Sequence, residues 1–404
     1  MSELVIPKPV KHKFFTPGMV IVTLLALNGL YFLAKRFLFG MGAVTNLNNF
    51  YPWGLWIGVD VAAGVALAAG GFVTAAMGHI FHLPNMKPVI RPALLTAMLG
   101  YTFVGIGVMV DIGRWYYIWH PMIYWNGTSP LFEVGICVMT YLTVLYIEFF
   151  PIVTERFRGK VNLPNILSIF NKPIEFLFKL FDNTLGKAMF IFIIAGVVLS
   201  TLHQSSLGTL MVIAGYKMHP LWLTPIMPLL FFISAICVGI PMVLFESLIA
   251  SRSFGVKPEM EVLKNIAAYV PLLLGIYLGF KLGDMAIRKS FVYLFEFNKY
   301  SIAWLIEIIF GVIIPLVMLN FKKVLNSPLW LFIAATLVVA GVLINRINTF
   351  IIAYHPLYAK VAYVPSFGEI SVTVGFICLM VILYRIIVMI FPVISLPVKN
   401  EEKY

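Results

Sequence analysis

The chain consists of long apolar runs separated by short polar segments, and each run is long enough to cross a membrane as a helix. A transmembrane helix requires about 20 consecutive, predominantly apolar residues. The runs that meet this requirement lie near residues 17–38, 53–80, 92–118, 131–152, 187–206, 222–250, 264–286, 299–320, 328–350 and 368–391. The pattern therefore predicts an all-α polytopic membrane protein with about ten transmembrane helices.

Composition agrees with one integral membrane domain that covers residues 1–404. Of the 404 residues, 61% are hydrophobic and 11% are charged, so the chain lacks the charged surface that keeps a soluble domain in water. No glycine-rich nucleotide-binding motif follows a strand pattern, which leaves ATP-driven chemistry without a site. Residues near 163–182 alternate apolar with polar or basic positions, and we expect an amphipathic helix there along the membrane interface.

The basic residues indicate how the chain is oriented. A net charge of +12 is compatible with nucleic-acid binding, but Lys and Arg of polytopic proteins accumulate in loops that stay in the cytoplasm. If the amino terminus is inside, most of the 29 Lys and Arg residues fall in cytoplasmic segments. We therefore expect a multi-pass protein of the bacterial inner membrane, with both termini in the cytoplasm and no nucleic-acid partner. A count of nine or eleven helices would reverse half of these assignments.

Ionisable side chains inside the predicted helices are the first candidates for function, because a charge within the bilayer is costly. Asp60 lies about two turns below the outer end of the second helix, and Asp111 and Arg114 lie near the outer end of the third. Asp111 and Arg114 are three residues apart and can form an ion pair on one helix face, with either a functional or a purely structural role. Glu133 opens the fourth helix on the same side. Together they predict an outer polar cluster.

The segment STLHQSSLGTL at 200–210 places polar residues directly after an apolar run. Unsatisfied polar groups in hydrocarbon are expensive, so a row of them usually faces a cavity or a partner. We expect the helix to break here near the outer face, so that His203, Gln204 and Ser205 join the outer cluster. The alternative is a core histidine that is hydrogen-bonded to Ser205 or Ser206.

A second group of candidates lies closer to the cytoplasm and consists of Tyr101, Arg91, Glu148 and Glu246. Glu133 and Glu148 are separated by about 22 Å along one helix, on nearly the same face. The fourth helix can therefore carry carboxylates at both ends of a proton relay. The alternative for Arg91 and Glu148 is that they reach the water at the inner interface and have no further role.

Cofactors held by cysteine or histidine are not expected. Cys137, Cys237 and Cys378 lie alone in separate apolar runs, which suits neither an iron–sulfur cluster nor another metal site. A membrane dihaem cytochrome needs paired histidines on facing helices. All of the seven histidines except His203 fall at helix ends or in loops, so His203 lacks an evident partner and we expect no haem.

Five segments of the chain carry a resemblance to a known family. They are FYPWGLWIGVDVAAGVALAAGGF (50–72), IRPALLTAMLGYTFVGIGVMVDIGRWY (90–116), SPLFEVGICVMTYL (129–142), TLHQSSLGTLMVIAGYKMHPLW (201–222) and WLIEIIFGVIIPLV (304–317). These segments resemble the NrfD/polysulfide-reductase family of quinone-interacting membrane subunits. Among its members they are most similar to the HybB type, the membrane subunits of periplasm-facing nickel–iron hydrogenases. The resemblance covers nearly the whole chain, and its most specific parts are the His-Gln-Ser-Ser and Asp-x-Gly-Arg segments.

This resemblance implies a fold, partners and a substrate. Eight central helices would form two stacked four-helix bundles, with extra helices at the ends, and Glu133 and Glu307 are a weak trace of such a repeat. The subunit would hold no redox cofactor of its own. It would sit in lipid, anchor a periplasmic iron–sulfur (ferredoxin-like) subunit together with the hydrogenase large and small subunits, and pass electrons to or from menaquinone or ubiquinone.

A quinone site needs hydrogen-bond partners for both carbonyls, an apolar channel for the tail and groups that deliver protons. The candidate quinone-binding residues are His203, Tyr101, Asp60, Gln204 and Ser205. The candidate proton-relay residues are Glu133, Glu148, Asp111, Arg114, Arg91 and Glu246. We expect the inner carboxylates to couple quinone reduction to proton movement across the membrane.

Three alternatives remain at this point. The chain could serve another periplasmic oxidoreductase of the same family, such as one that acts on polysulfide or nitrite. It could be a secondary transporter, whose buried charges would bind a solute near the membrane centre. It could also be only a membrane anchor, in which case its buried ionisable residues would be replaceable.

Overall fold

The computed structural model describes residues 5–81, 83, 86–161 and 165–397. Within these residues, ten helices are long and apolar enough to cross a membrane, which confirms the predicted all-α polytopic fold. The spans are Pro17–Phe39, Trp56–Ile80, Pro88–Asp111, Pro130–Phe157, Ala188–Lys217, Met227–Phe254, Met260–Ile287, Lys299–Leu319, Pro328–Ile352 and Phe367–Ile390.

The second to fifth spans form a first four-helix bundle. In it α3 packs on α4, α4 on α5, α5 on α6, and α6 returns to α3. The second span also contains two π-helical turns, Trp56–Ala63 and Ala76–Ile80. The helices of this bundle are α2 (Gly64–Leu67), α3 (Ala69–Ala75), α4 (Lys87–Asp111), α5 (Pro130–Phe157) and α6 (Asn171–Ala214).

The sixth to ninth spans form a second bundle of the same kind. Here α7 packs on α9, α9 on α11, and α13 on both α11 and α7. The two bundles meet where α7 lies against α3 and α6. The helices of this bundle are α7 (Met227–Phe254), α8 (Met260–Ala267), α9 (Val270–Ile287), α10 (Lys299–Ile308), α11 (Ile314–Leu319) and α13 (Pro328–Ile347), with the short α12 (Lys322–Leu325) before α13.

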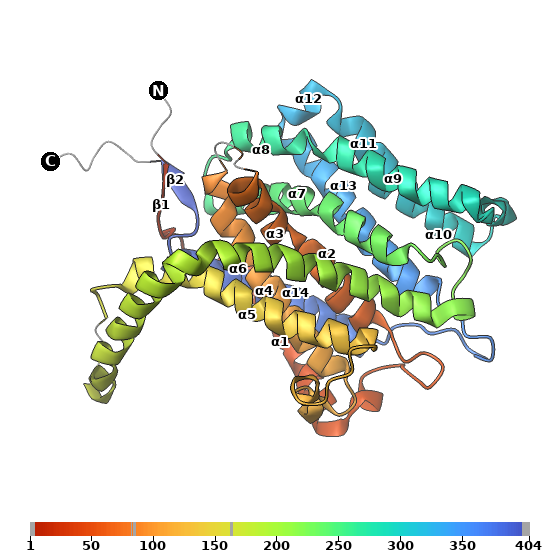
Figure 1. The fold of residues 1–404 in the computed structure, drawn as a ribbon, viewed down its shortest axis with the longest axis horizontal. Coiled ribbons are helices and arrows are strands. Elements are labelled where there is room, and N and C mark those ends of the chain that lie inside the picture. Colours follow the sequence, from red (N-terminus) through yellow and green to blue (C-terminus); the bar gives the residue numbers. More distant parts are fainter. Residues whose placement is uncertain (1–4, 82, 84–85, 162–164, 398–404) are drawn as a thin grey trace.

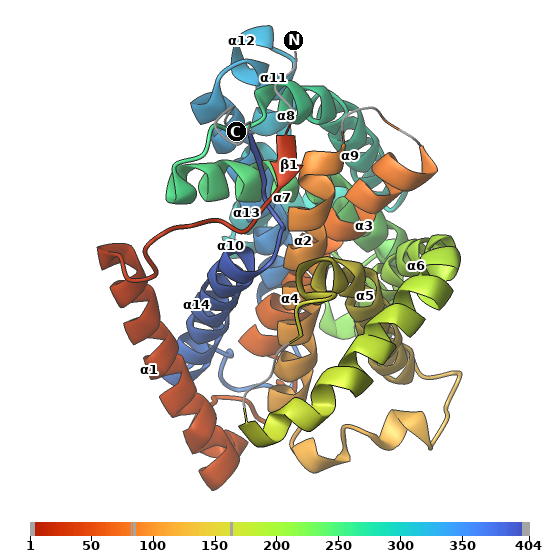
Figure 2. The same ribbon diagram turned by 90° about the vertical axis from the view of Figure 1, so that its left-hand side faces the viewer.

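The first and last helices, α1 (Pro17–Phe39) and α14 (Phe367–Ile390), pack together outside the two bundles (Figure 2). Their contact is close because Gly29 of α1 faces Gly375 of α14. A Cβ atom at Gly29 would come within 2.6 Å of the Gly375 Cα atom, so a side chain at this position would push the two helices apart. Small residues allow such close approach in membranes, where packing replaces the hydrophobic effect between helices.

The two ends of the described chain lie at the same end of the molecule (Figure 1). There β1 (Val5–Pro7) and β2 (Ser395–Pro397) pair as antiparallel strands. An even number of spans requires this arrangement, so the strand pair agrees with ten helices. We call this end the terminal face and the opposite end, which holds the loops after the first, third and fifth spans, the distal face.

Helix starts follow ordinary capping signals. The hydroxyls of Thr16 and Ser129 accept hydrogen bonds from the backbone of the first turns of α1 and α5, and Pro17 and Pro130 follow them directly. Ser366 and the carboxylate of Glu369 form a reciprocal capping box at the start of α14. Ser-Pro and Thr-Pro pairs before apolar runs therefore place these boundaries to within a residue.

The expected helix break at 200–210 is wrong. Helix α6 runs unbroken through this segment to Ala214, so His203 lies in the middle of its span and not at the distal face. The hydroxyls of Ser205 and Ser206 donate to the carbonyl of Leu202, at 2.9 and 2.8 Å. Serine satisfied by its own helix in this way needs no break in the backbone.

The predicted interfacial helix near 163–182 is only partly described, because residues 163–164 lie outside the described chain. The rest forms a short helix, Asn165–Phe170, followed by the first turns of α6. Figure 1 shows these turns leaving the first bundle near the terminal face. Their position along a membrane interface stays a prediction.

Candidate functional site

Asp60 lies four residues into its span, in the π-helical turn Trp56–Ala63 near the distal face. Such turns are rare and occur frequently at functional sites, because the extra residue re-aims side chains. The Asp60 Oδ2 atom accepts a 2.8 Å hydrogen bond from the hydroxyl of Thr373 on α14. A carboxyl and a hydroxyl from separate helices are thereby held together.

Asp60 borders a cavity of about 160 Å³ that the second span shares with α4, α7, α13 and α14. Its walls are mostly apolar and include Phe103 and Phe376, whose ring centroids are 5.6 Å apart. Asp60 and Thr96 are the polar side chains of its described lining. We call this space the Asp60 cavity. The lining has the composition of a small-molecule site, and its volume is below the usual range of about 300–1,000 Å³.

Asp111 and Arg114 do not form the predicted ion pair. Helix α4 ends at Asp111 and Ile112 is extended, so the helical spacing that would align the two residues is lost. Arg36 of α1 instead holds this helix end, donating to the carbonyls of Val110 and Ile112 at 2.7 and 2.6 Å. Asp111 Oδ1 is buried without a hydrogen-bond partner, and Arg114 is exposed.

The interior of the first bundle holds a cluster of buried polar residues, Tyr101, Tyr141, Ser200, His203 and Gln204, which we call the Tyr–His cluster. The ring centroid of Tyr101 lies 4.4 Å from that of Tyr141 and 5.6 Å from that of His203. Both His203 nitrogens and the oxygens of Tyr101 and Ser200 make no hydrogen bond of ordinary geometry in the described structure. Buried polar atoms of this kind mark places where water or a ligand binds.

Glu148 extends the Tyr–His cluster toward the terminal face. Its Oε1 atom lies beside Gly196 of α6, since a Cβ atom there would be 3.0 Å from Oε1 and 3.6 Å from the Tyr141 ring. Glu148, Tyr141, Tyr101 and His203 therefore follow one another through the first bundle. Gln204 continues the line by donating a 2.8 Å hydrogen bond to the carbonyl of Val65 in the second span.

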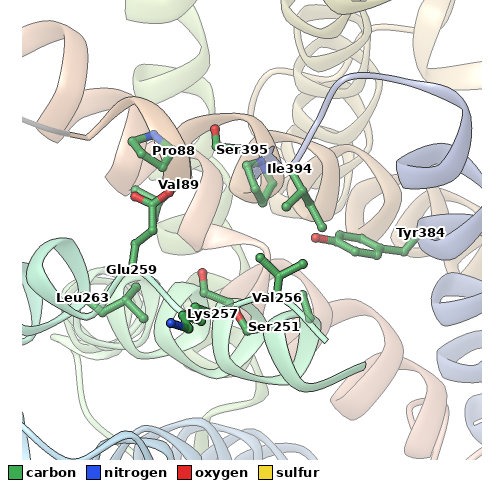
Figure 3. Close-up of a pocket in the computed structure, with 13 residues that line it drawn as sticks. Pro88, Val89, Ser251, Val256, Lys257, Glu259, Leu263, Tyr384, Ile394 and Ser395 are labelled. Carbon is green, nitrogen blue, oxygen red and sulfur yellow. The ribbon is translucent and has the colours of Figure 1, made fainter. Parts of the chain in front are cut away.

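Glu246 lies away from that line, in a larger cavity between α1, α7 and α14 that Thr96 and Tyr384 also border. Tyr384 borders a further pocket at the terminal face, and Figure 3 shows its hydroxyl pointing into that pocket. Glu259 and Lys257 line the same pocket, and burial raises the pKa of the Glu259 carboxyl. Polar groups thus connect Glu246 to the terminal face.

Two of the relay candidates lie at the surface. Glu133 is exposed in the first turn of α5, where a carboxylate stabilises the helix by interacting with its dipole. Arg91 forms a 2.7 Å ion pair with Glu155 and donates to the carbonyl of Pro392 at 2.8 Å. Arg91 therefore ties α4 and α5 to the segment after α14, and neither residue touches the Tyr–His cluster.

The second bundle holds a buried ion pair that the sequence analysis missed. The ammonium of Lys281 on α9 contacts the Glu307 carboxylate on α10, with side chains 6% and 1% exposed. Asn345 and Asn348 donate to this carboxylate, each at 2.8 Å, and the Trp222 indole donates at 3.1 Å. Each charge is therefore compensated, as burial in a membrane requires.

Arg346 completes this network and is fully buried. It donates to Asn345 Oδ1 at 2.5 Å and to Ser234 Oγ at 2.8 Å, and its guanidinium carbon lies 3.6 Å from the centroid of the Phe231 ring. The signal was available in the sequence, because a lysine in LGFKLGD and an arginine in INRIN interrupt two otherwise apolar runs.

Comparison with known protein families identifies the family of this chain. The family model "Polysulphide reductase, NrfD" matches residues 43–356, which include every helix of both bundles. The chain belongs to the NrfD family. The first and last helices lie outside the matched region.

Relatives of this NrfD protein are membrane subunits of several oxidoreductase complexes. The "Probable Ni/Fe-hydrogenase 2 b-type cytochrome subunit" of Escherichia coli K12 is 31% identical over 98% of this chain and 97% of its own length. The menaquinone reductase integral membrane subunit of Nitratidesulfovibrio vulgaris is 25% identical over 93% and 89%. A selenate reductase subunit of Mesobacillus selenatarsenatis is 23% identical over 95% of both chains. A role as a redox-enzyme subunit follows from this family.

The name of the Escherichia coli relative raises the question of haem. A b-type haem in a membrane bundle needs two axial histidines from facing helices. Among the described histidines, His203 lies in the middle of a span, whereas the others lie at span ends or in loops. The rings of Tyr101 and Tyr141 fill the space beside His203. The described residues of this NrfD protein therefore do not fit a bis-histidine haem.

Proposed function

We propose that this chain is the quinone-reacting membrane subunit of a periplasm-facing hydrogen:quinone oxidoreductase. It passes electrons between a periplasmic iron–sulfur subunit of a nickel–iron hydrogenase and menaquinone or ubiquinone. The hydrogenase active site lies in the partner subunits. Support for hydrogen as the electron source comes from the Escherichia coli relative, which aligns over almost the full length of both chains.

The Asp60 cavity is the observation that carries this proposal. Its walls are apolar and include two neighbouring phenyl rings, and the Asp60 carboxyl on its border is held by the Thr373 hydroxyl. This combination suits a flat apolar ring with polar oxygens. Asp60 is near the distal face, which the distribution of basic residues predicts to be periplasmic. An electron donor docked on that face is therefore close to a quinone beside Asp60.

Quinone reduction consumes two electrons and two protons for each quinol formed. The iron–sulfur partner supplies the electrons, and the Asp60 carboxyl beside Thr373 is placed to give a proton to a quinone oxygen and to be reprotonated. The line Glu148, Tyr141, Tyr101 and His203 supports a proton path from the terminal face. Protons taken up there would couple the reaction to the membrane potential.

The decisive experiment measures hydrogen-dependent reduction of a water-soluble menaquinone analogue by membranes that carry the assembled complex. Asp60→Asn removes the acid but keeps the shape, and we expect a loss of about 100-fold or more, the usual contribution of a general acid. Reduction of a soluble dye directly by the hydrogenase should be unchanged. Glu133→Gln is the matched control, because Glu133 is exposed. Wild-type quinone reduction by Asp60→Asn would overturn the assignment of the site.

A second candidate is the same chemistry with another catalytic partner, which the menaquinone reductase and selenate reductase relatives favour. The same membranes separate the two candidates. Quinol oxidation or quinone reduction with a different periplasmic substrate, and none with hydrogen, would select this second candidate and leave the Asp60 cavity in place.

A further inference from the structure

A cavity of about 370 Å³ lies between α1, α7 and α14, and it is larger than the Asp60 cavity. This volume is within the range of small-molecule pockets, about 300–1,000 Å³. Its lining is mostly apolar and includes Met19 and Val22 of α1, Phe245 and Ile249 of α7, and Val381 of α14. We call it the lateral slot. Its position outside the two bundles sets it apart from the Tyr–His cluster.

The lateral slot adjoins the Asp60 cavity. Thr96, Met242 and Met380 line both spaces, so the two cavities share these side chains as a common wall, and we call the two cavities together the passage. Thr16, directly before α1, borders the slot at the terminal face, whereas Asp60 borders the other end of the passage near the distal face. The passage therefore extends over most of the length of a membrane span. A head group of a few rings fills only part of it.

The lateral slot is open to lipid along one side. Ile249 and Val381 line it, and they are 41% and 42% exposed. Helix α1 forms the other wall and is mostly exposed itself, since its close contact is with α14 through Gly29 and Gly375. A molecule dissolved in the bilayer can therefore reach the slot without crossing either bundle.

Buried polar atoms that make no hydrogen bond of ordinary geometry line the lateral slot, where Thr96 and Tyr384 both lie beside the Glu246 carboxyl. They are Thr96 Oγ1, Glu246 Oε1, Tyr384 Oη and Arg385 Nε. Thr96 is 9% exposed and Arg385 is 7% exposed, so lipid and bulk water do not satisfy them. A plain acyl chain would leave these atoms unpaired at a cost. An amphiphile with hydrogen-bonding oxygens on its head can pair with these atoms as the head passes them, and its tail then lies against the apolar walls.

We propose that the isoprenoid quinone enters from the bilayer through the lateral slot and, once its head is beside Asp60, leaves its tail in that slot. This inference rests on the proposed quinone chemistry and adds the route and the tail site. It predicts that the slot matters only for quinones with a long tail. A short, water-soluble analogue can occupy the Asp60 cavity without filling the slot.

The test narrows the slot and compares two quinones. Val22→Trp on α1 places a large ring in the slot, and Leu24→Trp on the lipid-facing side of the same helix, where Leu24 is 61% exposed, is the control. Membranes with the assembled complex are assayed for hydrogen-dependent reduction of long-chain menaquinone, of a tail-less analogue and of a soluble dye. We expect Val22→Trp to lower long-chain reduction about tenfold, with the other two rates within about twofold of wild type.

Each outcome has a distinct meaning. Equal rates of long-chain menaquinone reduction by Val22→Trp and Leu24→Trp would overturn the proposal that the quinone tail occupies the lateral slot. An equal loss with both quinones, while dye reduction persists, would also overturn it. Val381→Trp narrows the slot from α14 and should repeat the result if Val22→Trp fails to assemble, which dye reduction reports. If wild-type membranes reduce dye but neither quinone, the proposed function itself fails.

Discussion

Lys281 and Glu307 form an ion pair in the interior of the second bundle, and both side chains are almost completely buried. Removing one partner of such a pair leaves an uncompensated charge in low dielectric, which costs about 3–5 kcal/mol. We expect Lys281→Met or Glu307→Gln alone to destabilise the protein by this amount in mild detergent. The double variant should recover at least half of the loss in thermal unfolding. Additive losses would show that the residues act independently.

Replacement of His203 tests the Tyr–His cluster. We expect His203→Ala to reduce the quinone rate by about tenfold or more, because it removes an acid–base group from the line through the first bundle. Hydrogen-dependent dye reduction should persist. Ser205→Ala is the matched control on the same helix, since the Ser205 hydroxyl donates to the carbonyls of Thr201 and Leu202 in its own helix. Unchanged quinone reduction in His203→Ala would make His203 a packing residue.

Glu148→Gln tests whether protons come from the terminal face. The substitution keeps the contact with Gly196 but cannot release a proton. The assay uses sealed vesicles with a pH indicator on the terminal side. We expect the number of protons taken up from that side per quinone reduced to fall, while reduction of the soluble electron-acceptor dye by the hydrogenase stays constant. Glu155→Gln, which only loses an ion pair to Arg91, is the comparison. Undiminished proton uptake would remove Glu148 from the path.

His219 makes the stability of the loop around it, at the distal face, depend on pH. Its ring stacks on Tyr300 with centroids 4.2 Å apart, and burial lowers its pKa, with Glu296 acting to raise it and His355 to lower it. The unfolded residue gains its proton near pH 6.5, whereas the folded residue resists protonation, so stability is lost as pH falls below about 6.5. Hydrogen exchange of residues 215–222, corrected for intrinsic rates, should therefore increase from pH 7 to pH 5. His219→Phe should abolish the increase.

An optical spectrum tests the cofactor prediction. We expect the purified chain, after expression with haem available, to show no b-type Soret band, because the described residues offer His203 no axial partner on a facing helix. A Soret band that disappears in His203→Ala would contradict this expectation and would assign the axial ligand at the same time.

The fold was largely predictable because lipid imposes a simple rule on sequence. Apolar runs of sufficient length gave all ten spans, and prolines after Ser or Thr marked several helix starts. The continuity of α6 through His203 was not predictable from polarity alone. The serines there satisfy their hydroxyls on carbonyls of their own helix, and periodicity does not show whether a polar group faces its backbone or a cavity.

The site was less predictable, since it depends on contacts between distant spans. Asp60 could be singled out from sequence, but its partner Thr373 lies more than three hundred residues away. The pairing of Asp111 with Arg114 failed because Arg36 of the first span holds the end of α4. Lys281 and Arg346 were missed because they lie inside later apolar runs, and their partners lie on other helices that the sequence pattern does not bring together.

The strand pair between β1 and β2 can form only after nearly the whole chain has been synthesised. Val5 pairs with Pro397, and the backbone of Lys8 donates to the carbonyl of Ile394 at 3.1 Å. A ribosome delivers these partners at opposite ends of synthesis, so α1 enters the bilayer long before α14 exists to hold it. Helix α1 therefore stays in lipid without its packing partner until α14 is inserted. The wall of the lateral slot that these two helices form is complete only then.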